Sequence, residues 1–461
     1  MLLRRQPLPP FANERCGFSL KADAPPWRKS ASVKHLGRYR GGSRPVPLSF
    51  PGATRLLLQG TGSMVDNATV TPGRTIWLMA VTAGTVVANN YYNQPLLGEM
   101  AADLSVSDQA ASWIASATQI GYALGLLALL PLGDRVDRRR MISLMLCLSA
   151  VMMVLFSLAG TYALVVPLGF LIGLTSIVPQ ILPPIASQIV PPESAPSAVG
   201  KVMAGLLLGI VLSRFVGGWL GDLIGWRQVY LVAAGIMIVL MIVLRLSLPA
   251  FAPTFKGSYL DLMGSLKTLF LRHPLLRSIS FAAALQFGAF SLFWTTLAFH
   301  LSAMPGHYSA RMAGSFALVG AVGVLGALAT GRAVSRFSTR QVLVFSGALM
   351  LLAFVLFMGA TRSLVLMVPA VILLDLGMQM SHVTSMSTIL GIDRQSTSRL
   401  NTVYMVTRFA GGALGTVAGG FAWHYGGWMA VTMVGALFCL VALLINAGAS
   451  STAEGSMTDA V

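Results

Sequence analysis

The sequence predicts an all-α polytopic membrane protein, with twelve transmembrane helices in two pseudo-symmetric six-helix bundles. Its mean hydropathy is +0.74, and 55% of its residues are hydrophobic while only 10% are charged. A soluble domain typically has about 25% charged residues, so this composition excludes one. A pattern of small residues around an arginine also occurs twice, which indicates a duplicated unit.

Apolar runs long enough to cross a bilayer define the expected helices. A hydrocarbon core of about 30 Å requires about 20 helical residues. The first six runs form an N-terminal bundle, residues 75–248, and the last six a C-terminal bundle, residues 278–447; the basic segment 249–277 links them. The runs lie near 75–96, 110–131, 141–159, 163–186, 200–223, 228–248, 278–301, 310–331, 341–360, 363–386, 400–421 and 428–447.

The duplication rests on the segment 200–221. Small residues recur there at every fourth position, so one helix face is narrow enough for another backbone to approach closely. Arg214 interrupts this segment, and a similar pattern surrounds Arg408, at an offset of 194 residues. The glycines expected to pack helices are Gly205, Gly209, Gly217, Gly218, Gly411, Gly412 and Gly415.

The distribution of Lys and Arg predicts the orientation. If the first span begins inside, the inner loops and helix ends hold sixteen of these residues and the outer ones three. Since short loops rich in Lys and Arg stay in the cytoplasm, both termini are expected there.

The net charge of +17 does not indicate a nucleic-acid partner. Residues 1–63 hold eleven Lys or Arg and two acidic residues, and the inner loops account for the remaining excess. The basic segment 1–74 has no helical or strand periodicity and is expected to be a disordered tail, with translation starting at Met64. A transit peptide is the alternative. Residues 448–461 are expected to be a second disordered tail.

No cofactor and no metal site is expected. Cys16, Cys147 and Cys439 lack a paired spacing, and the histidines have no second ligand at a suitable spacing. No Gly-rich phosphate loop follows a strand, which argues against an ATP-driven pump.

Amide side chains gather at the end of the first span and recur in later spans. An amide in hydrocarbon needs a hydrogen-bond partner, so the group at the first span faces a wet cavity or other helices, unless it only caps the outer end of the helix. Both interpretations stay open. The candidate substrate-cavity residues are Asn89, Asn90, Tyr92, Asn93, Gln94, Gln119, Gln180, Gln286, Trp294 and Gln379.

Asp375 is an ionisable residue near the middle of the span 363–386. A charge at that depth is costly unless it is paired or hydrated. Arg408 on the next span is the expected partner, and Arg214 belongs to the same set of buried charges. Three roles for Asp375 remain open: a static ion pair, a proton-coupling carboxyl whose pair breaks on protonation, and a solvated acid facing a cavity. Aligning Gln180 with Gln379 places Ser176 opposite Asp375, so one half alone holds the acid.

The loop 132–140 between the second and third spans carries carboxylates and guanidinium groups together. We expect an interhelical lock on the inner side, with simple positive-inside anchoring as the alternative. With this loop, two six-span halves and a basic linker, residues 75–447 resemble the major facilitator superfamily. Its inner-loop motif reads G-x-x-x-D-[RK]-x-G-[RK]-[RK]: Asp134, Arg135, Arg138 and Arg139 match, and Leu130 and Asp137 replace its two glycines.

The fifth span resembles a second motif of this superfamily, the antiporter motif G-x8-G-x3-G-P-x2-G-G of drug/proton exchangers. Ser213 and Arg214 replace its Gly-Pro pair, and Gly169 lies where a span-4 arginine is often found. The resemblance implies the efflux-permease-like bacterial branch, with proton coupling left open. The matching residues are Gly200, Gly209, Gly217 and Gly218.

These features together predict a secondary active transporter of a small organic solute that works by alternating access. Proton-coupled efflux is the favoured mode, and uptake or facilitated transport of a metabolite is the alternative. A membrane-embedded enzyme or sensor is less favoured, because no catalytic constellation and no soluble domain is visible. The resemblance further implies a monomer in the bacterial inner membrane, whose partners are its solute, protons and the lipid bilayer.

Overall fold

A computed structural model describes residues 72–251, 258–321, 336–393 and 396–448. These described residues belong to one compact unit. All regular secondary structure in the described ranges is helical. The expected tail before residue 72, its proposed start at Met64 and the expected tail from residue 449 lie outside the described residues.

The first half of the unit comprises eight α-helices and three short 3-10 helices. They are α1 (Pro72–Val87), η1 (Ala88–Asn90), α2 (Asn93–Asp103), α3 (Asp108–Ala128), η2 (Leu130–Asp134), α4 (Arg138–Leu158), α5 (Tyr162–Thr175), α6 (Val178–Gln188), η3 (Pro192–Ser194), α7 (Ala195–Ile224) and α8 (Trp226–Ser247).

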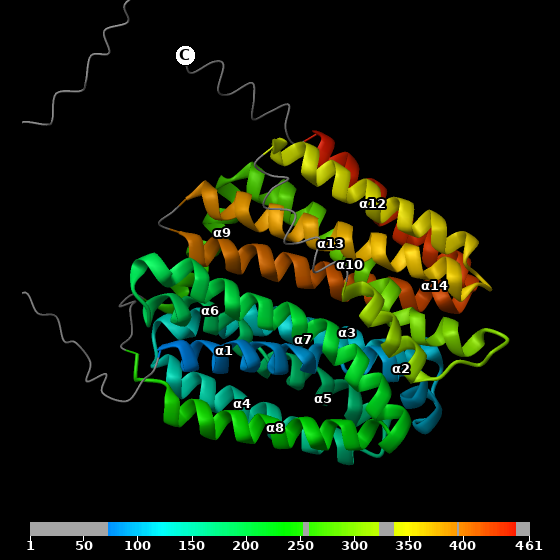
Figure 1. Ribbon diagram of the computed structural model, residues 1–461, viewed down its shortest axis with the longest axis horizontal. Helices are drawn as coiled ribbons and strands as arrows, with labels where there is room; N and C mark the ends of the chain where they lie inside the picture. The colour runs from blue at the N-terminus through cyan, green and yellow to red at the C-terminus, as the bar shows by residue number, and fades with distance from the viewer. Residues whose placement is uncertain (1–71, 252–257, 322–335, 394–395, 449–461) are drawn as a thin grey trace, which may run out of the picture. The chain divides into compact units, whose positions relative to one another are not determined.

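The linker contains one helix, and the second half follows it (Figure 1). Residues 310–321 are also helical, up to the end of the described range. The named helices are α9 (Tyr259–Arg272), α10 (Pro274–Ala303), α12 (Thr339–Gly359), α13 (Leu364–Ile392) and α14 (Thr397–Gly448).

Two expected spans are interrupted in the middle of the bundle. The first breaks between α1 and α2, where the buried amides of Asn89 and Asn90 lie in a 3-10 turn. The fourth breaks between α5 and α6, because Pro179 has no N–H to donate to the carbonyl four residues earlier. There the side chain of Ser176 donates to the Ile172 carbonyl at 2.7 Å.

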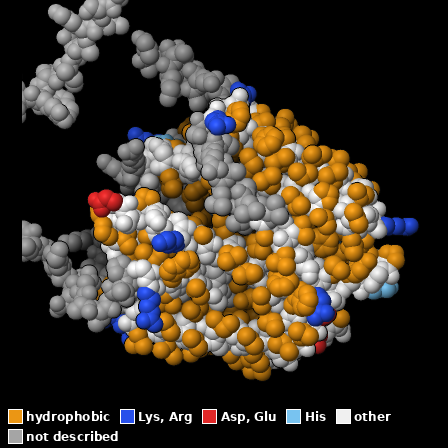
Figure 2. Space-filling model, in the orientation of Figure 1, with side chains coloured by type: hydrophobic (Ala, Val, Ile, Leu, Met, Phe, Trp, Pro, Cys, Tyr) orange, Lys and Arg blue, Asp and Glu red, His pale blue; other side chains and the backbone are white. Residues whose placement is uncertain are grey.

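Eight described helices are long and apolar enough to cross a membrane by length and composition. The 52-residue helix α14 counts once among them, although Gly426 and Gly427 leave helical geometry and divide it into the two last spans. Gly427 has φ 56°, a backbone conformation that glycine adopts readily. Hydrophobic side chains cover most of the described part of the face in Figure 2, as a lipid-facing surface requires.

The two halves use the same helix crossing. A Cβ added at Gly209 in α7 would lie 2.2 Å from the Gly84 carbonyl oxygen in α1. A Cβ added at Gly415 in α14 would lie 2.1 Å from the Gly288 carbonyl oxygen in α10. In each half a second contact lies one turn away, between Gly205 and Ala80 and between Gly411 and Ala284. Backbones this close supply the van der Waals contact that holds helices together in lipid.

The remaining glycines of the expected packing set also lie in tight places. A Cβ added at Gly217 would lie 3.3 Å from the Tyr92 ring, and one at Gly218 would lie 2.5 Å from the Ala310 carbonyl oxygen. A Cβ added at Gly412 would lie 2.6 Å from both Gln119 and Phe287. The contacts of Gly218 and of Gly412 with Gln119 join the two halves.

These contacts do not support the offset of 194 residues that the arginines suggested. In these contacts Gly205 of α7 is equivalent to Gly411 of α14. Arg214 lies nine residues after Gly205, whereas Arg408 lies three residues before Gly411. At 1.5 Å per residue the two arginines differ in height by about 18 Å. Because small residues recur at every fourth position in both helices, the sequence alone allows several alignments of α7 with α14.

The linker marks one side of the bundle, which we call the linker side. The amphipathic helix α9 buries Leu262 and Leu266 there, and the Tyr259 hydroxyl donates to the Ala128 carbonyl at 2.9 Å. We call the opposite side, where α7 ends and α8 begins, the far side.

Candidate functional site

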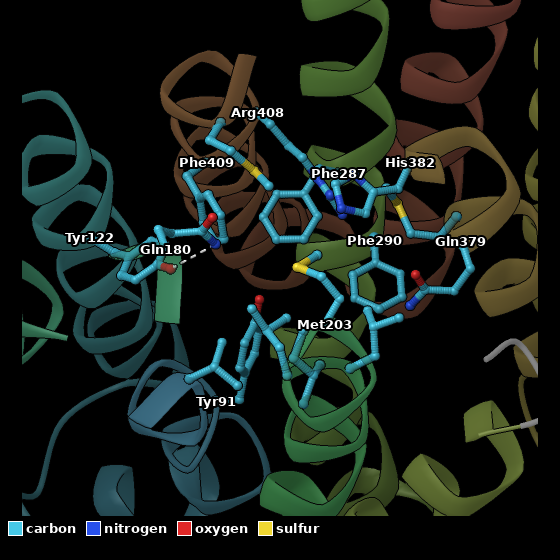
Figure 3. Close-up of a pocket in the computed structure, with 16 residues that line it drawn as sticks. Tyr91, Tyr122, Gln180, Met203, Phe287, Phe290, Gln379, His382, Arg408 and Phe409 are labelled. Carbon is cyan, nitrogen blue, oxygen red and sulfur yellow. Dashed lines mark hydrogen bonds between the residues drawn. The ribbon is translucent and has the colours of Figure 1, made fainter. Parts of the chain in front are cut away.

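A cavity lies between the two halves, near the breaks in α1–α2 and α5–α6. Its volume of about 40 Å³ admits a few water molecules but is below that of an ordinary ligand site. The first half contributes Val87, Tyr91, Tyr122, Gln180, Met203, Leu206, Leu207 and Ile210, and the second half Phe287, Phe290, Met378, Gln379, His382, Met405, Arg408 and Phe409 (Figure 3).

The cavity wall is largely apolar, with several aromatic rings, and carries one guanidinium group. Arg408 lies 4.4 Å from the centre of the Phe287 ring, and its Nε has no hydrogen-bond partner. His382 shares a hydrogen bond of 2.9 Å with the Tyr404 hydroxyl. Across the cavity, the Gln180 amide donates to the Tyr122 hydroxyl at 3.4 Å (Figure 3). The site therefore offers a cation, amides and ring faces.

A second and larger space, of about 470 Å³, lies between the halves on the linker side. Its walls include Arg138 and Gln188 from the first half and Asn401 from the second. Gln180 and Met203 line both this space and the central cavity. These two side chains therefore stand at the junction of a path from the linker side.

The far side is closed by contacts between the halves. Arg311 pairs with Asp222 at 3.8 Å and lies 3.9 Å from the centre of the Trp219 ring. The Trp219 indole donates to Ser315 at 3.2 Å. Farther around the same side, the Trp423 indole donates to Asp108 at 2.9 Å. The molecule is thus open toward the linker side and shut at the far side.

Arg214 is buried between the central cavity and this closure, with 2% of its surface exposed. Its Nε donates to Gln94 at 2.7 Å, within the first half. Its guanidinium lies 4.4 Å from the centre of the Trp294 ring of the second half and 4.8 Å from that of Tyr91. An amide and aromatic faces therefore hold this charge, in place of a direct carboxylate contact.

Asp375 is buried as well, with 3% of its surface exposed, and its Oδ2 has no hydrogen-bond partner. The carboxyl occupies the space beside Gly320, where an added Cβ would lie 2.8 Å from Oδ2. Among the described side chains no ion pair joins Asp375 to Arg408. Arg214 is the described cation that attracts Asp375 electrostatically, although no ion pair joins the two side chains. The static Asp375–Arg408 pair is therefore not formed in this conformation.

Of the ten predicted substrate-cavity residues, Gln180 and Gln379 line the central cavity. Most of the others join helices. Gln119 donates to Thr416 at 3.1 Å across the two halves. In the first half, Asn89 donates to Ser176, Asn90 to the Val87 carbonyl and Asn93 to Thr118. The Tyr92 ring packs against Tyr230 in the same half. In the second half, Gln286 accepts from Ser381.

Sequence reasoning missed several side chains that give the cavity its character, such as Tyr122, Phe290 and Met405. Nothing in their spacing separates them from core packing. His382, on the span before that of Arg408, also lines the cavity. These residues line the cavity because the fold places them at a similar depth between the two halves.

One of the predicted inner-loop residues, Arg138, joins parts of the first half on the linker side. Arg138 donates to the Gly133 carbonyl at 3.1 Å and to Gln188 at 3.4 Å. Arg135 is exposed, Arg139 is the second residue of α4, and the Asp134 side chain lies outside the described atoms. Asp137, which replaces a motif glycine, caps α4 through the Arg139 N–H and also accepts from the Phe251 N–H at 3.1 Å.

Replacing Asp137 with Ala is expected to destabilise the protein by about 1 kcal/mol, since it removes an N-cap. It also frees the start of the linker from α4. The measurement is the thermal unfolding of the purified protein in detergent. Asp261→Ala serves as the matched control, because it alters the cap of α9 without touching α4. Equal losses in both variants would show that the contact with Phe251 adds nothing.

Comparison with known proteins identifies a family whose model spans both halves. The family model described as Major Facilitator Superfamily matches residues 78–416. The uncharacterized transporter YgaY of Escherichia coli O157:H7 is 38% identical over 370 residues, covering 80% of this chain and 94% of that protein. The purine ribonucleoside efflux pump NepI of Escherichia coli O127:H6 is 25% identical over 179 residues, covering 38% of this chain and 44% of the pump.

A solved structure shares the fold. The bacterial homologue of the human lysosomal transporter Spinster, in an inward-facing and occupied conformation, superposes with a TM-score of 0.63. It is 18% identical and covers 82% of this chain and 97% of its own. The predicted class of twelve helices in two six-helix bundles is confirmed.

Proposed function

The chain belongs to the major facilitator superfamily, and we propose that it exports a small organic solute in exchange for protons. Members of this family are transporters of small solutes, and this chain is a transporter rather than an enzyme. The direction of transport and its coupling to protons are the proposed part.

The observation that carries the proposal is a cavity between two related halves, reached from one side and closed at the other. A carrier needs such a site, exposed to one compartment at a time. Rocking of the halves would separate Arg311 from Asp222 on the far side and close the space beside Gln180 on the linker side. The shared glycine crossings support rocking of each half as a unit.

The linker side is assigned to the cytoplasm because Lys and Arg gather there, so both termini are cytoplasmic in this proposal. In that orientation the described conformation admits a solute from the cytoplasm. We place the protein as a monomer in the inner membrane of a bacterium.

Asp375 supports the proton coupling. Its buried carboxyl has no hydrogen-bond partner at Oδ2 and lies in the field of Arg214. Arg214 also contacts Trp294 in the opposite half. Protonation of Asp375 removes its attraction for Arg214, which changes the relative energies of the open and closed far side.

The export direction draws on the antiporter-like glycines of α7 and on the partial similarity to an efflux pump. Uptake uses the same architecture. The flux experiment therefore has to separate the two directions.

The test is transport of a panel of labelled solutes into inverted membrane vesicles, with and without an imposed proton gradient. Export appears there as accumulation that depends on an acidic lumen and that a protonophore abolishes. Vesicles lacking the protein provide the background. Accumulation that survives the protonophore would contradict proton coupling, and gradient-driven loss of preloaded solute would indicate uptake.

A further inference from the structure

The buried charges of the bundle do not balance. Among the Asp, Glu, Lys and Arg side chains that the structure describes, the buried ones are Arg214, Arg408 and Asp375, with exposed fractions of 2%, 7% and 3%. The undescribed internal segments 252–257, 322–335 and 394–395 contain no Asp or Glu, and Asp134, whose side chain is not described, belongs to the loop on the linker side. Two buried guanidinium groups are thus accompanied by one buried carboxyl, and an unneutralised charge in this environment is costly.

The excess charge is located at Arg408. Arg214 donates to Gln94, lies against several ring faces and interacts electrostatically with Asp375. Arg408 lacks a carboxylate contact among the described residues, its Nε is unpartnered, and it lines the central cavity. An anion that enters this cavity would therefore gain a charge-assisted hydrogen bond from a donor that is already desolvated.

The rest of the cavity favours an apolar body next to the acidic group. The ring of Phe409 lies 4.5 Å from that of Tyr122 and 5.0 Å from that of Phe287, which makes a continuous aromatic wall. Met203 and Met405 complete the lining. Methionine side chains are flexible, so they can move aside and enlarge the small cavity around a ligand.

We propose that the cargo of this transporter is an amphipathic organic anion, a carboxylate or similar acid on an aromatic or aliphatic body, whose charged group binds Arg408. The inference rests on the proposed transport function and narrows it. The amides of Gln180 and Gln379 flank the site and supply polar contacts for a weakly polar body.

The test uses three probes of the same skeleton, 3-phenylpropanoate, 3-phenylpropanamide and 3-phenylpropylamine. Binding to the purified protein in detergent is measured as ligand-dependent thermal stabilisation, which needs no gradient. We expect the acid to bind at least about tenfold more tightly than the amide or the amine, since a hydrogen bond to a charged group contributes roughly a factor of ten to one hundred.

Variants at the site separate charge from shape. Arg408→Gln is expected to weaken binding of the acid by about tenfold to one hundredfold, and Arg408→Lys by less. The matched control is Arg399→Gln on the same helix, whose guanidinium donates to Ser396 on the linker side; it should bind the acid normally. Gln379→Glu places a carboxylate at the cavity with little change of shape and should also weaken binding of the acid.

The proposal is overturned if the amide or the amine binds as well as the acid, if the acid does not bind, or if Arg408→Gln binds it unchanged. Gln379→Glu keeps the test decisive where Arg408→Gln fails to fold. Failure here leaves the transport proposal standing if vesicles still show gradient-driven flux of a neutral or cationic solute. Conversely, absence of driven flux does not affect a binding measurement made without a membrane.

Discussion

Vesicles containing the Asp375→Asn variant are expected to lose solute transport driven by a proton gradient and to keep solute exchange. Asparagine has nearly the shape of aspartic acid but cannot bind and release a proton. The side chain lies beside Gly320 with no hydrogen bond at Oδ2, so the substitution breaks no hydrogen bond there. Exchange needs only the rocking of the halves around the solute, which does not require a proton to dissociate.

The measurement compares gradient-driven accumulation with exchange of labelled for unlabelled solute in the same vesicles. Driven accumulation should fall to the level found without a gradient, and the exchange rate should stay near that of the wild type. Asp103→Asn is the matched control, because it makes the same chemical change at a half-exposed carboxylate paired with Arg227 at 2.7 Å. Surface pairs contribute little, so this variant should retain driven transport. Undiminished driven transport in Asp375→Asn would remove Asp375 from the coupling step.

The sequence was sufficient to predict the class of fold, because hydropathy and span length are set by the bilayer rather than by tertiary detail. The breaks inside the first and fourth spans were not predicted. Buried amides lie at the first break and a proline at the second, and a window of average hydropathy does not resolve either. The linker helix α9 was also missed, although the spacing of Leu262 and Leu266 agrees with an amphipathic helix.

The site was predictable only in part, since an amide has the same sequence signature whether it faces water or another helix. Gln180 and Gln379 line the cavity, whereas Asn89 and Asn93 donate to hydroxyls within the first half. Neither group is fully hydrogen-bonded, because the Oδ1 atoms of Asn89 and Asn93 and the Oε1 atom of Gln379 have no partner. An unpartnered amide oxygen therefore does not separate the two groups. The alignment of the helices determines which of these amides line the cavity. The repeated arginine pattern suggested a different alignment of the two halves, so the sequence did not reveal which amides they are.

The close crossing of α1 and α7 leads to the second prediction with a large expected effect. Replacing Gly209 with Ala is expected to destabilise the protein severely, because the new methyl group would meet the Gly84 backbone at 2.2 to 2.5 Å. Backbone atoms cannot rotate away, so α1 and α7 must separate along the crossing and lose the contact that joins them in lipid. Overpacking of this kind typically costs about 1–3 kcal/mol, and more where a backbone has to move.

Gly235→Ala provides the matched control, since a Cβ at Gly235 in α8 has no atom within 4 Å. The same substitution there removes a flexible residue from a helix and should leave stability unchanged or raise it slightly. Thermal unfolding and the monodisperse yield in detergent report both effects. Gly415→Ala is expected to match Gly209→Ala, because its methyl group would meet Gly288 in the equivalent crossing. If Gly209→Ala were as stable as Gly235→Ala, close backbone contact would not be what holds α1 and α7 together. If Gly415→Ala alone were tolerated, the two halves would not share one mode of assembly.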